Sequence, residues 1–426
     1  MEYKNVYIVG IGGIGLSAFA QLLASQGTRV VGSDRGDSPT TELLRSKGVE
    51  VFIGHDARNM PQDLDVLIYS DAIPAHNPER AHAHDLGIPE LSYFEALGKV
   101  ANEKKVIAIS GAHGKTTTTA MLIDVFEDAG LEPVGVVGSL RAKTKSNFRA
   151  GTGEYFIVEA DEYLRHFLQF NPFGLVITNI DEDHLDYYHD LADIQSAFRT
   201  LAQKVPTHGF VVCNMQDEKV KPVIEGLTCS VIDYGKYLEP ALSLKVLPFN
   251  MVNAAAALAV ADALSINLET TRQSLEKFAG TWRRFEYKGT TQNGAVVYDD
   301  YGHHPTEVTA TLKSVREHFP GKRIIVAFHP HLYSRTKILL EEFTSAFDAA
   351  DVALIAPIFA AREAPDPTIS SEILAERIRA RGRDARAVTL GEVTDEIRKA
   401  GKDDIFITMG AGDIYKAGEE GLLPAA

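Results

Sequence analysis

The sequence predicts an α/β protein of three domains whose sheets are largely parallel. Short apolar runs rich in β-branched residues alternate with longer segments of helical periodicity along most of the 426 residues. Two of these runs end in glycine-rich turns, at residues 10–15 and 111–114, and a helical pattern follows each turn. A glycine turn between a strand and a helix is typical of doubly wound and phosphate-loop domains. We expect domains at residues 1–102, 103–280 and 281–426.

The first domain shows the β-α-β alternation of a doubly wound, Rossmann-like sheet. Its strands are short apolar runs, and the polar residues 101–104 mark the expected boundary with the second domain. We expect strands at residues 6–9, 29–32, 51–53 and 66–69, and a helix at residues 16–26.

The second domain is predicted to be of the phosphate-loop type, and the third to be Rossmann-like again. The second begins with an apolar strand at residues 106–109, which enters the second glycine turn. Its further strands are expected at residues 155–159, 175–178 and 210–213, and its helices at 120–130, 251–265 and 268–278. In the third domain, strands are expected at residues 296–298, 324–328, 352–356 and 405–409, and helices at 305–318, 338–350 and after Ser370.

Composition and charge exclude several classes of function. The net charge of −15 argues against a nucleic-acid partner, which favours a basic face. No apolar run approaches the roughly 18 residues that span a bilayer. The two cysteines, Cys213 and Cys229, form no C-x-x-C pair and indicate a reducing compartment. The first residues pass directly into a strand, so we expect no signal peptide and a cytoplasmic protein.

The first glycine motif predicts a diphosphate site. Gly10, Gly12 and Gly15 form a G-x-G-x-x-G pattern between a strand and a helix, and Asp34 ends the next strand 19 residues after Gly15. This is the context of a dinucleotide fingerprint, which taken alone suggests a nicotinamide-dependent dehydrogenase. The same loop also binds the pyrophosphate of a UDP-sugar, and its glycines could instead serve only helix–strand packing.

The second motif predicts a triphosphate site. It is a shortened phosphate loop, G-x-x-G-K-T, because Ile109 occupies the place of the first glycine in the usual pattern. Two glycines allow the backbone N–H groups to point at an anion, and the following helix N-terminus favours negative charge. Lys115 is placed to reach the β- and γ-phosphates, and the Thr116 hydroxyl to hold Mg²⁺. The alternative is a flexible glycine turn without a ligand.

Acidic residues and one histidine follow at the ends of two later apolar strands. Glu159 ends one of them and is well placed to hold Mg²⁺ beside the phosphate loop. His184, in the acidic segment 181–186, is a further candidate ligand, although magnesium prefers oxygen and a lone histidine is usually structural. Acidic loops are often only solvated surface, and this is the alternative interpretation of Glu182 and Asp190.

These motifs together resemble the Mur ligases, the ATP-dependent enzymes that build the peptide stem of peptidoglycan, and the resemblance covers nearly the whole chain. Ala112 stands where the family usually has threonine. The matching segments are residues 10–17, 32–34, 54–55, 112–119, 159–162, 178–186, 283–286, 299–307, 330–336 and 410–414.

The resemblance implies an ATP- and Mg²⁺-dependent ligase that joins L-alanine to UDP-N-acetylmuramate through an acyl phosphate. The alternative within the family is the recycling ligase that attaches a whole tripeptide to the same sugar. Tyr163 after Glu162 favours the recycling ligase, whereas the first glycine motif and residues 331–336 favour alanine addition. A nicotinamide-dependent dehydrogenase leaves the phosphate loop and the third domain unexplained. The intact Lys115, Glu159 and His184 argue against a non-catalytic binding module. We expect a monomer or a homodimer.

The resemblance also implies roles for individual residues. The implied catalytic residues are Lys115, Tyr301, His303 and Arg335. The implied ATP-binding residues are Gly111, Gly114, Lys115, Thr116, Thr117, Asn250, Arg283, Arg284 and Asp300. The implied UDP-sugar-binding residues are Gly12, Gly13, Ile14, Gly15, Asp34, His55 and Ser70. The implied metal ligands are Thr116, Glu159 and His184.

Several residues depart from the family pattern. Phe249 replaces a histidine that lies against the adenine ring, and Leu332 replaces an arginine often found in the alanine site. Pro357 and Phe359 depart from an Asp-x-Tyr motif. Phe198 occupies the place of a carbamylated lysine in some sister ligases, and its presence fits the alanine-adding branch.

Overall fold

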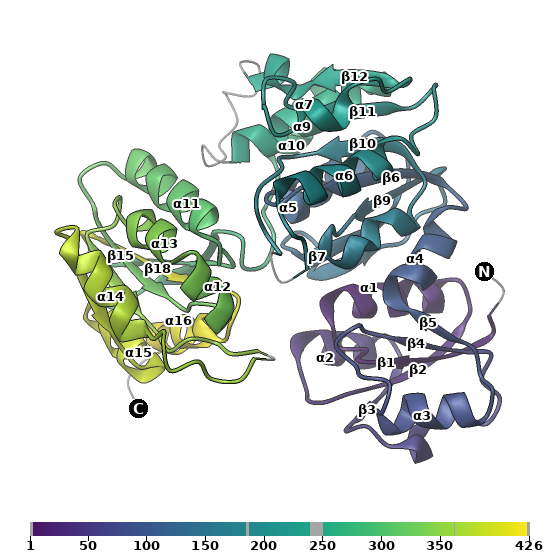
Figure 1. The fold of residues 1–426 in the computed structure, drawn as a ribbon, viewed down its shortest axis with the longest axis horizontal. Helices are drawn as coiled ribbons and strands as arrows, with labels where there is room; N and C mark the ends of the chain where they lie inside the picture. The colour runs from purple at the N-terminus through teal and green to yellow at the C-terminus, as the bar shows by residue number, and fades with distance from the viewer. Residues whose placement is uncertain (1–2, 185–186, 239–249, 362, 424–426) are drawn as a thin grey trace. The chain divides into compact units, whose positions relative to one another are not determined.

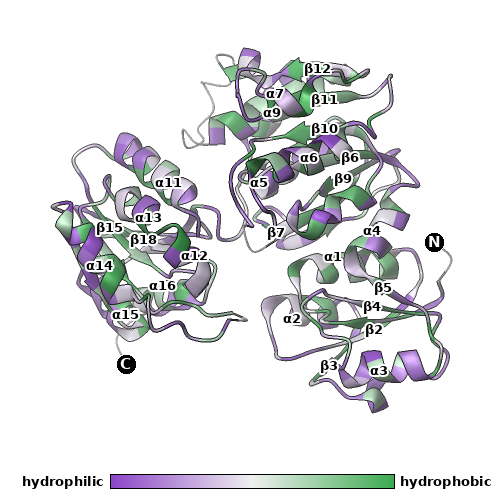
Figure 2. Ribbon diagram, in the orientation of Figure 1, coloured by the Kyte–Doolittle hydropathy of each residue, from purple (hydrophilic) through white to green (hydrophobic). Residues whose placement is uncertain are grey.

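The computed structural model describes residues 3–184, 187–238, 250–361 and 363–423, and these residues form three α/β sheets (Figure 1). The strand orders are β3-β2-β1-β4-β5, β12-β11-β10-β6-β9-β7-β8 and β13-β14-β18-β15-β16-β17. Figure 2 shows hydrophobic residues gathered along the strands and hydrophilic residues on outward helices such as α3 and α11. The predicted three-domain α/β fold is confirmed, while the exact domain boundaries stay predictions.

The first sheet is parallel throughout its described strands and has its switch point between β1 and β4. Strand β1 pairs with β2 on one side and with β4 on the other, so the strand order reverses there. In open α/β sheets, ligands bind outside the carboxyl ends of the strands at such a point. Gly10 follows β1 and Ser70 follows β4 at this position. The strands are β1 (Asn5–Val9), β2 (Arg29–Asp34), β3 (Glu50–Ile53), β4 (Val66–Tyr69) and β5 (Glu90–Ser92).

The second sheet places the phosphate loop at the carboxyl end of its central strand, β6. That strand pairs in parallel with β9 and β10, so Glu159 and Thr178 lie at the same edge as the loop. Within the described residues, only the β7–β8 pair of this sheet is antiparallel. The strands are β6 (Lys105–Ser110), β7 (Val134–Arg141), β8 (Ser146–Arg149), β9 (Tyr155–Glu159), β10 (Pro172–Ile177), β11 (Phe210–Cys213) and β12 (Ser230–Asp233).

The third sheet is parallel apart from its edge strand β13, which pairs antiparallel with β14. Strands β14, β18 and β15 lie side by side, and their carboxyl ends bring Asp300, Met409 and Phe328 to one edge. The strands are β13 (Glu286–Thr290), β14 (Val296–Asp300), β15 (Arg323–Phe328), β16 (Val352–Ile355), β17 (Asp384–Ala387) and β18 (Asp404–Met409).

The helices agree with the sequence prediction in most places but not at two. The predicted helix 338–350 is confirmed only in part: α13 occupies residues 340–346 of it, and Leu339, whose ψ of 26° is not helical, separates α13 from α12, which ends at Ile338. The phosphate-loop helix begins at Lys115 rather than at residue 120, because Gly114 supplies its left-handed N-cap. The helices are α1 (Ile14–Ser25), α2 (Pro39–Ser46), α3 (Pro78–Asp85), α4 (Tyr93–Ala101), α5 (Lys115–Asp128), α6 (Leu191–Ala202), α7 (Lys221–Ile224), α9 (Asn250–Ala263), α10 (Leu268–Glu276), α11 (Pro305–His318), α12 (Tyr333–Ile338), α13 (Leu340–Ala346), α14 (Ser371–Ala380), α15 (Leu390–Lys399) and α16 (Ile414–Leu422). Short 3₁₀ helices are η1 (Ala57–Asn59), η2 (Tyr163–Gln169) and η3 (Tyr234–Tyr237).

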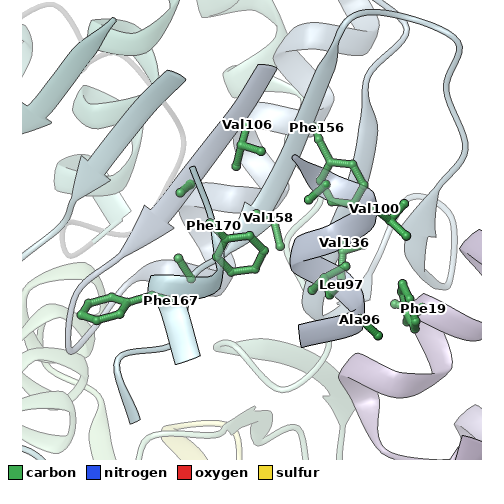
Figure 3. Packing of buried hydrophobic residues seen from close by; sticks show 14 of the residues in the cluster. Phe19, Ala96, Leu97, Val100, Val106, Val136, Phe156, Val158, Phe167 and Phe170 are labelled. Atoms are coloured by element: carbon green, nitrogen blue, oxygen red, sulfur yellow. The ribbon is translucent and has the colours of Figure 1, made fainter. Parts of the chain in front are cut away.

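The described residues divide into two compact units, and the chain passes from the first to the second near residue 280. In the first unit, one hydrophobic core joins the first two sheets: Phe19 of α1 and Leu97 of α4 belong to the same cluster as Phe156 of β9 and Phe167 of η2 (Figure 3). Burial of apolar surface stabilises by about 25 cal/mol per Å², so a shared core holds these sheets together. No described helix is long and apolar enough to cross a membrane.

Candidate functional site

The first glycine loop is closed tightly against the strand that follows α1. The Gly12 N–H donates to Asp34 Oδ2 at 2.8 Å. A Cβ at Gly12 would lie 2.7 Å from Thr41 Cγ2, and a Cβ at Gly15 would lie 2.8 Å from the Tyr93 ring. Both glycines are therefore required by close approach. Gly13 is the N-cap of α1, where unpaired backbone N–H groups favour an anion.

A buried carboxylate holds His55 beside this loop. Glu79 accepts hydrogen bonds from Tyr7 Oη at 2.7 Å and from Ser33 Oγ at 2.6 Å, and His55 Nδ1 lies 3.1 Å from its Oε2. Burial, followed by the Glu79 carboxylate, raises the pKa of Tyr7 well above its usual range. Sequence reasoning missed Glu79, because an acidic residue in the first turn of α3 has the same appearance as an ordinary capping residue.

Ser70 and Ile14 complete the predicted UDP-sugar set. A Cβ at Gly10 would lie 3.2 Å from the Ser70 Cβ, so the two loops of the switch point are in contact. The Ile14 carbonyl accepts a hydrogen bond from Asn147 Nδ2 at 2.5 Å. Asn147 belongs to β8 and also contacts Gln21 at 2.8 Å, so the second sheet fixes the start of α1. Sequence reasoning missed Asn147.

The phosphate loop is curled by two glycines in the left-handed region. Gly111 has a φ of 131°, and a Cβ there would lie 2.2 Å from Thr178 Oγ1. Gly114 has a φ of 88°, and a Cβ there would lie 2.4 Å from Asn253 Oδ1. The His113 N–H donates to Asn179 Oδ1 at 2.9 Å. Only glycine satisfies these two positions, as a phosphate-binding turn before a helix requires.

Lys115 points across this loop to a glutamate. Its Nζ donates to the Gly111 carbonyl at 2.5 Å and lies 3.0 Å from each oxygen of Glu162. Burial lowers the pKa of Lys115, but Glu162 and Asp161 outweigh this effect and raise it. Burial raises the pKa of Glu162, against the opposing effect of Lys115. The lysine is therefore cationic. A phosphate group is an anion like the Glu162 carboxylate and could take its place beside Lys115.

Oxygen atoms suited to magnesium converge beside the loop. Thr116 Oγ1 donates to Glu159 Oε2 at 3.1 Å, and the Gly138 N–H donates to the other oxygen of Glu159. A hydroxyl and a carboxylate at a phosphate loop are the donor types that Mg²⁺ prefers, so Thr116 and Glu159 fit the ion.

His184 lies with a different carboxylate. Its φ is 55°, and its Nε2 is 3.7 Å from Glu162 Oε1 and 3.9 Å from Asp183 Oδ2. Ligand atoms of Asp161, Glu162 and His184 lie within 4.8 Å of one another. The structure thus pairs Thr116 with Glu159 and His184 with Glu162, where the sequence grouped the predicted metal ligands together.

The remaining predicted nucleotide residues of the first unit lie along α5 and at the start of α9. Thr117 is buried in the first turn of α5. Asn250 accepts from Asn253 Nδ2 at 2.9 Å, and Asn253 Oδ1 accepts from Thr118 Oγ1 at 3.2 Å. Asn250 is therefore linked to the phosphate-loop helix. The predicted departure at Phe249 lies outside the described residues.

In the second unit, Arg283 links the end of β14 to the loop after β18. Its side chain is buried, with Nε 2.7 Å from Asp299 Oδ2 and the two terminal nitrogens donating to the carbonyls of Gly412 and Gly410 at 3.0 and 2.5 Å. Burial raises the pKa of Asp299 to about 6, against the opposing effect of Arg283. The sequence paired Arg283 with Arg284 as ATP ligands, but the guanidinium of Arg283 is occupied by these internal contacts.

Arg284 is more accessible than Arg283. Its side chain is 27% exposed and lies 3.7 Å from Glu307, and its guanidinium sits 5.1 Å from the Tyr301 ring centroid. Asp300 is buried, and its two oxygens accept the N–H groups of Gly302 and Phe285 at 2.8 Å each. Burial raises the pKa of Asp300. Its described contacts therefore shape the turn after β14.

The residues predicted to act on the amine cluster at the ends of β14 and β15. His303 Nδ1 lies 3.1 Å from the Tyr301 carbonyl oxygen, and its ring centroid is 5.5 Å from that of His331. Arg335 Nη1 is 3.5 Å from His331 Nδ1. Leu332 precedes α12 with a φ of 68°, so the chain turns sharply between His331 and Arg335. Tyr301, His303 and Arg335 are thus brought into one neighbourhood, with His331 between the last two.

Comparison with known proteins identifies the family of the chain. Three family models match: "Mur ligase family, catalytic domain" at residues 5–105, "Mur ligase middle domain" at 109–246 and "Mur ligase, glutamate ligase domain" at 283–412. A UDP-N-acetylmuramate–L-alanine ligase from Clostridium kluyveri is 40% identical over 98% of both chains. The chain belongs to the Mur ligase family.

Further relatives extend the likeness to solved structures. A UDP-N-acetylmuramate–L-alanine ligase from a Sulfurihydrogenibium species is 39% identical over 97% of this chain and 96% of its own. The crystal structure of a UDP-N-acetylmuramate–alanine ligase from Thermotoga maritima is 27% identical, with a TM-score of 0.81 over 97% of each chain. A murein peptide ligase from Psychrobacter arcticus shares the fold, at 20% identity and a TM-score of 0.71 over 99% of this chain and all of its own.

Proposed function

We propose that this Mur ligase uses ATP to join L-alanine to UDP-N-acetylmuramate. The observation that carries the proposal is the pair of glycine-built anion sites in the first unit, one at α1 and one at α5, which suits a reaction of two different nucleotides. The relatives that match over nearly the full length carry the same activity in their names. A dehydrogenase would need only the first of these sites.

The reaction proceeds in two balanced steps. A carboxylate oxygen of the sugar's lactyl group attacks the γ-phosphorus of ATP, the bond from that phosphorus to the bridging oxygen breaks, and ADP leaves. The neutral amine of L-alanine then attacks the acyl carbonyl, the carbon–oxygen bond to phosphate breaks, and phosphate leaves as the nitrogen loses a proton. Bound Mg²⁺ would neutralise charge on the phosphate oxygens.

The first unit supplies the groups for phosphoryl transfer. Lys115 exchanges Glu162 for phosphate oxygens and stabilises the charge that develops during transfer. Thr116 and Glu159 would hold the Mg²⁺ ion. Gly111 and Gly114 give the loop the left-handed turns that a phosphate-binding loop before a helix requires. The UDP diphosphate lies on the α1 loop, with His55 fixed beside it by Glu79.

The second unit supplies the groups for the amine and for the nucleotide. Arg335 offers a planar pair of donors to the α-carboxylate of L-alanine, a geometry that lysine does not reproduce. His303 and Tyr301 orient the amine or stabilise the tetrahedral intermediate. Arg284 replaces Arg283 as the proposed arginine for the phosphates, because Arg283 is held by Asp299 and two backbone carbonyls.

Phosphate release from ATP tests the proposal. The purified protein is given ATP, Mg²⁺ and UDP-N-acetylmuramate, with each amino acid in turn, and we expect release to depend on both the sugar nucleotide and L-alanine. Two results would contradict the assignment: no phosphate release with any amino acid, or a nicotinamide-dependent reduction without phosphate release.

The recycling ligase is tested in the same tube. L-alanine and the tripeptide L-alanyl-D-glutamyl-diaminopimelate are offered at equal concentration, and the products are separated by mass. We expect the L-alanine adduct to predominate. A product that carries the whole tripeptide would instead identify the protein as the recycling ligase. Tyr163 after Glu162 is the sequence feature that favours this alternative.

A further inference from the structure

A short strap joins the two anion sites of the first unit. It comprises residues 161–169, beginning at the carboxylates beside the phosphate loop and ending under α4. Two consecutive residues of this strap, Leu164 and Arg165, have left-handed φ values of 51° and 58°. Residues with a Cβ avoid this conformation, and it persists where surrounding contacts fix it, often at functional segments. The strap therefore has a conformation set by its partners.

The partner contacts converge on His166. Its Nε2 lies 3.1 Å from Asp71 Oδ2, and its Nδ1 lies 3.8 Å from Asp161 Oδ2, an ion-pair distance longer than a hydrogen bond. The imidazole stacks on Phe94 of α4, with ring centroids 4.2 Å apart and planes 14° apart. The side chain is only 13% exposed. Burial lowers the pKa of His166, but Asp161 and Asp71 raise it to about 9.

Each of the two carboxylates adjoins one anion site. Asp71 follows Ser70 at the switch point of the first sheet, beside the Gly10 turn. Asp161 precedes Glu162, whose carboxylate holds Lys115. His166 thus bridges a loop of the first sheet and the carboxylates of the second.

We propose that His166 is a positioning residue that clasps the loop after β4 to the Asp161–Glu162 pair, and so sets the sugar carboxylate in line with the phosphate that it attacks. This inference rests on the proposed function. His166 contacts neither reacting group; it acts through Asp71 on one side and Asp161 on the other. Because in-line phosphoryl transfer depends on placement, and a displacement of about 1 Å can cost on the order of 100-fold, a loosened clasp should slow the chemical step.

Two variants test the clasp. His166→Phe removes both polar contacts but keeps a ring to stack on Phe94. We expect a fall in kcat of at least ~10-fold, with the KM values for ATP and UDP-N-acetylmuramate changed less than ~3-fold, because misplacement affects turnover more than binding. Asp71→Ala should lower kcat in the wild-type background and have no further effect in His166→Phe, since both changes break one interaction.

The matched control is Asn102→Ala. Asn102 joins α4 to the same strap at its far end, donating from Nδ2 to the Gln169 carbonyl at 2.9 Å and accepting from the Asn171 N–H at 2.8 Å. Its loss weakens the same junction without touching Asp161 or Asp71. We expect its kcat to stay within about 2-fold of wild type, as for a residue outside the reaction.

The possible outcomes separate the clasp from the proposed function. If the wild-type protein forms no L-alanine adduct, the proposed function has failed. If wild type is active and His166→Phe keeps its kcat, or loses kcat only as much as Asn102→Ala does, the clasp is refuted. If the His166→Phe protein does not fold, Asp71→Ala alone replaces it, because Asp71 is partly exposed. Unchanged kcat in Asp71→Ala also refutes the clasp.

Discussion

At the scale of single residues, Lys115 is the side chain on which the proposed chemistry depends most. It is partly buried, cationic and held 3.0 Å from both oxygens of Glu162 at the phosphate loop. We expect Lys115→Ala to lower the ligation rate at least ~100-fold, because a preorganised charge on the transferring group contributes about 3 kcal/mol or more. UDP-N-acetylmuramate affinity, measured by titration calorimetry, should barely change, since that ligand binds at the α1 loop.

Lys105→Ala is the control for this substitution. Lys105 begins β6, at the end of the strand opposite to the phosphate loop, and pairs with Glu154 at 2.7 Å. Its loss removes a lysine from the strand that leads into the phosphate loop and should leave turnover within about 2-fold, as for an exposed ion pair. Retention of more than about a tenth of wild-type turnover by Lys115→Ala would refute its phosphate role, because such a loss is below about 1.4 kcal/mol.

Arg335 is the residue that should decide the acceptor. It lies 3.5 Å from His331 at the turn that Leu332 makes before α12. If it forks onto the carboxylate of L-alanine, Arg335→Lys should raise the KM for L-alanine at least ~10-fold, equivalent to about 1.4 kcal/mol. Steady-state kinetics with each substrate varied in turn provide the measurement. A parallel rise in the KM for ATP would instead place Arg335 at the nucleotide.

At the scale of elements, the first glycine loop should tolerate no side chain at Gly12. A valine there would press on Thr41 at 2.7 Å and on Asp34 Oδ2 at 2.9 Å, and would move the backbone away from the pyrophosphate. We expect Gly12→Val to weaken UDP-N-acetylmuramate binding at least ~10-fold and to spare ATP binding, as separate calorimetric titrations would show.

Gly36→Val is a suitable control for the glycine loop. Gly36 lies just beyond β2, and a Cβ there meets no atom within 4 Å. Its substitution should leave both affinities unchanged. If a folded Gly12→Val protein keeps its UDP-N-acetylmuramate affinity, the glycines of this loop serve only helix–strand packing and not diphosphate binding.

The elements that the sequence predicted well are those whose signal is local. The Gly–Lys–Thr run marked the phosphate loop, and a strand end marked Glu159, because turn geometry and strand ends are properties of a few consecutive residues. The break at Leu339 was missed, since an apolar periodic run continues through it.

Partners contributed from distant segments were beyond the reach of the sequence. Glu79 reaches His55 across 24 positions, and Asn147 reaches Ile14 across 133. His166 meets Asp71 only because two sheets share a core. The two adjacent arginines 283 and 284 look equivalent in the sequence, yet Arg283 is buried and its guanidinium donates to Asp299 and to backbone carbonyls. Such contacts follow from tertiary packing rather than from local pattern.

At the scale of the whole molecule, two compact units with separate hydrophobic cores imply two unfolding events. Described core clusters of the first unit include Phe156 and Phe126, while those of the second include Phe328 and Phe406. Calorimetry of the ligand-free protein should show two transitions, because multidomain chains depart from two-state behaviour. UDP-N-acetylmuramate should raise the transition of the first unit, since ligands stabilise the form that binds them. A single transition, unaltered in shape by ligand, would contradict this independence.

Acid should destabilise the second unit through His329, which is buried at the end of β15. Burial lowers its pKa to about 4; the Asp413 carboxylate opposes this effect and Arg283 adds to it. The folded protein therefore keeps this imidazole neutral, whereas the unfolded chain binds a proton below about 6.5. The stability that depends on neutral His329 is complete above that pH and is lost as the pH falls from about 6.5 to 4, by at most about 3 kcal/mol.

Because the pKa of Asp299 is raised to about 6, the folded state binds a proton at Asp299 before the unfolded state does, and the wild-type slope is partly cancelled. The difference between wild type and His329→Gln is thus the informative quantity. Between pH 6.5 and 4.5, the unfolding temperature of the second unit should fall less in His329→Gln than in wild type. His318→Gln, at the exposed end of α11, should track wild type. Equal acid sensitivity in all three proteins would show that His329 does not titrate in this range.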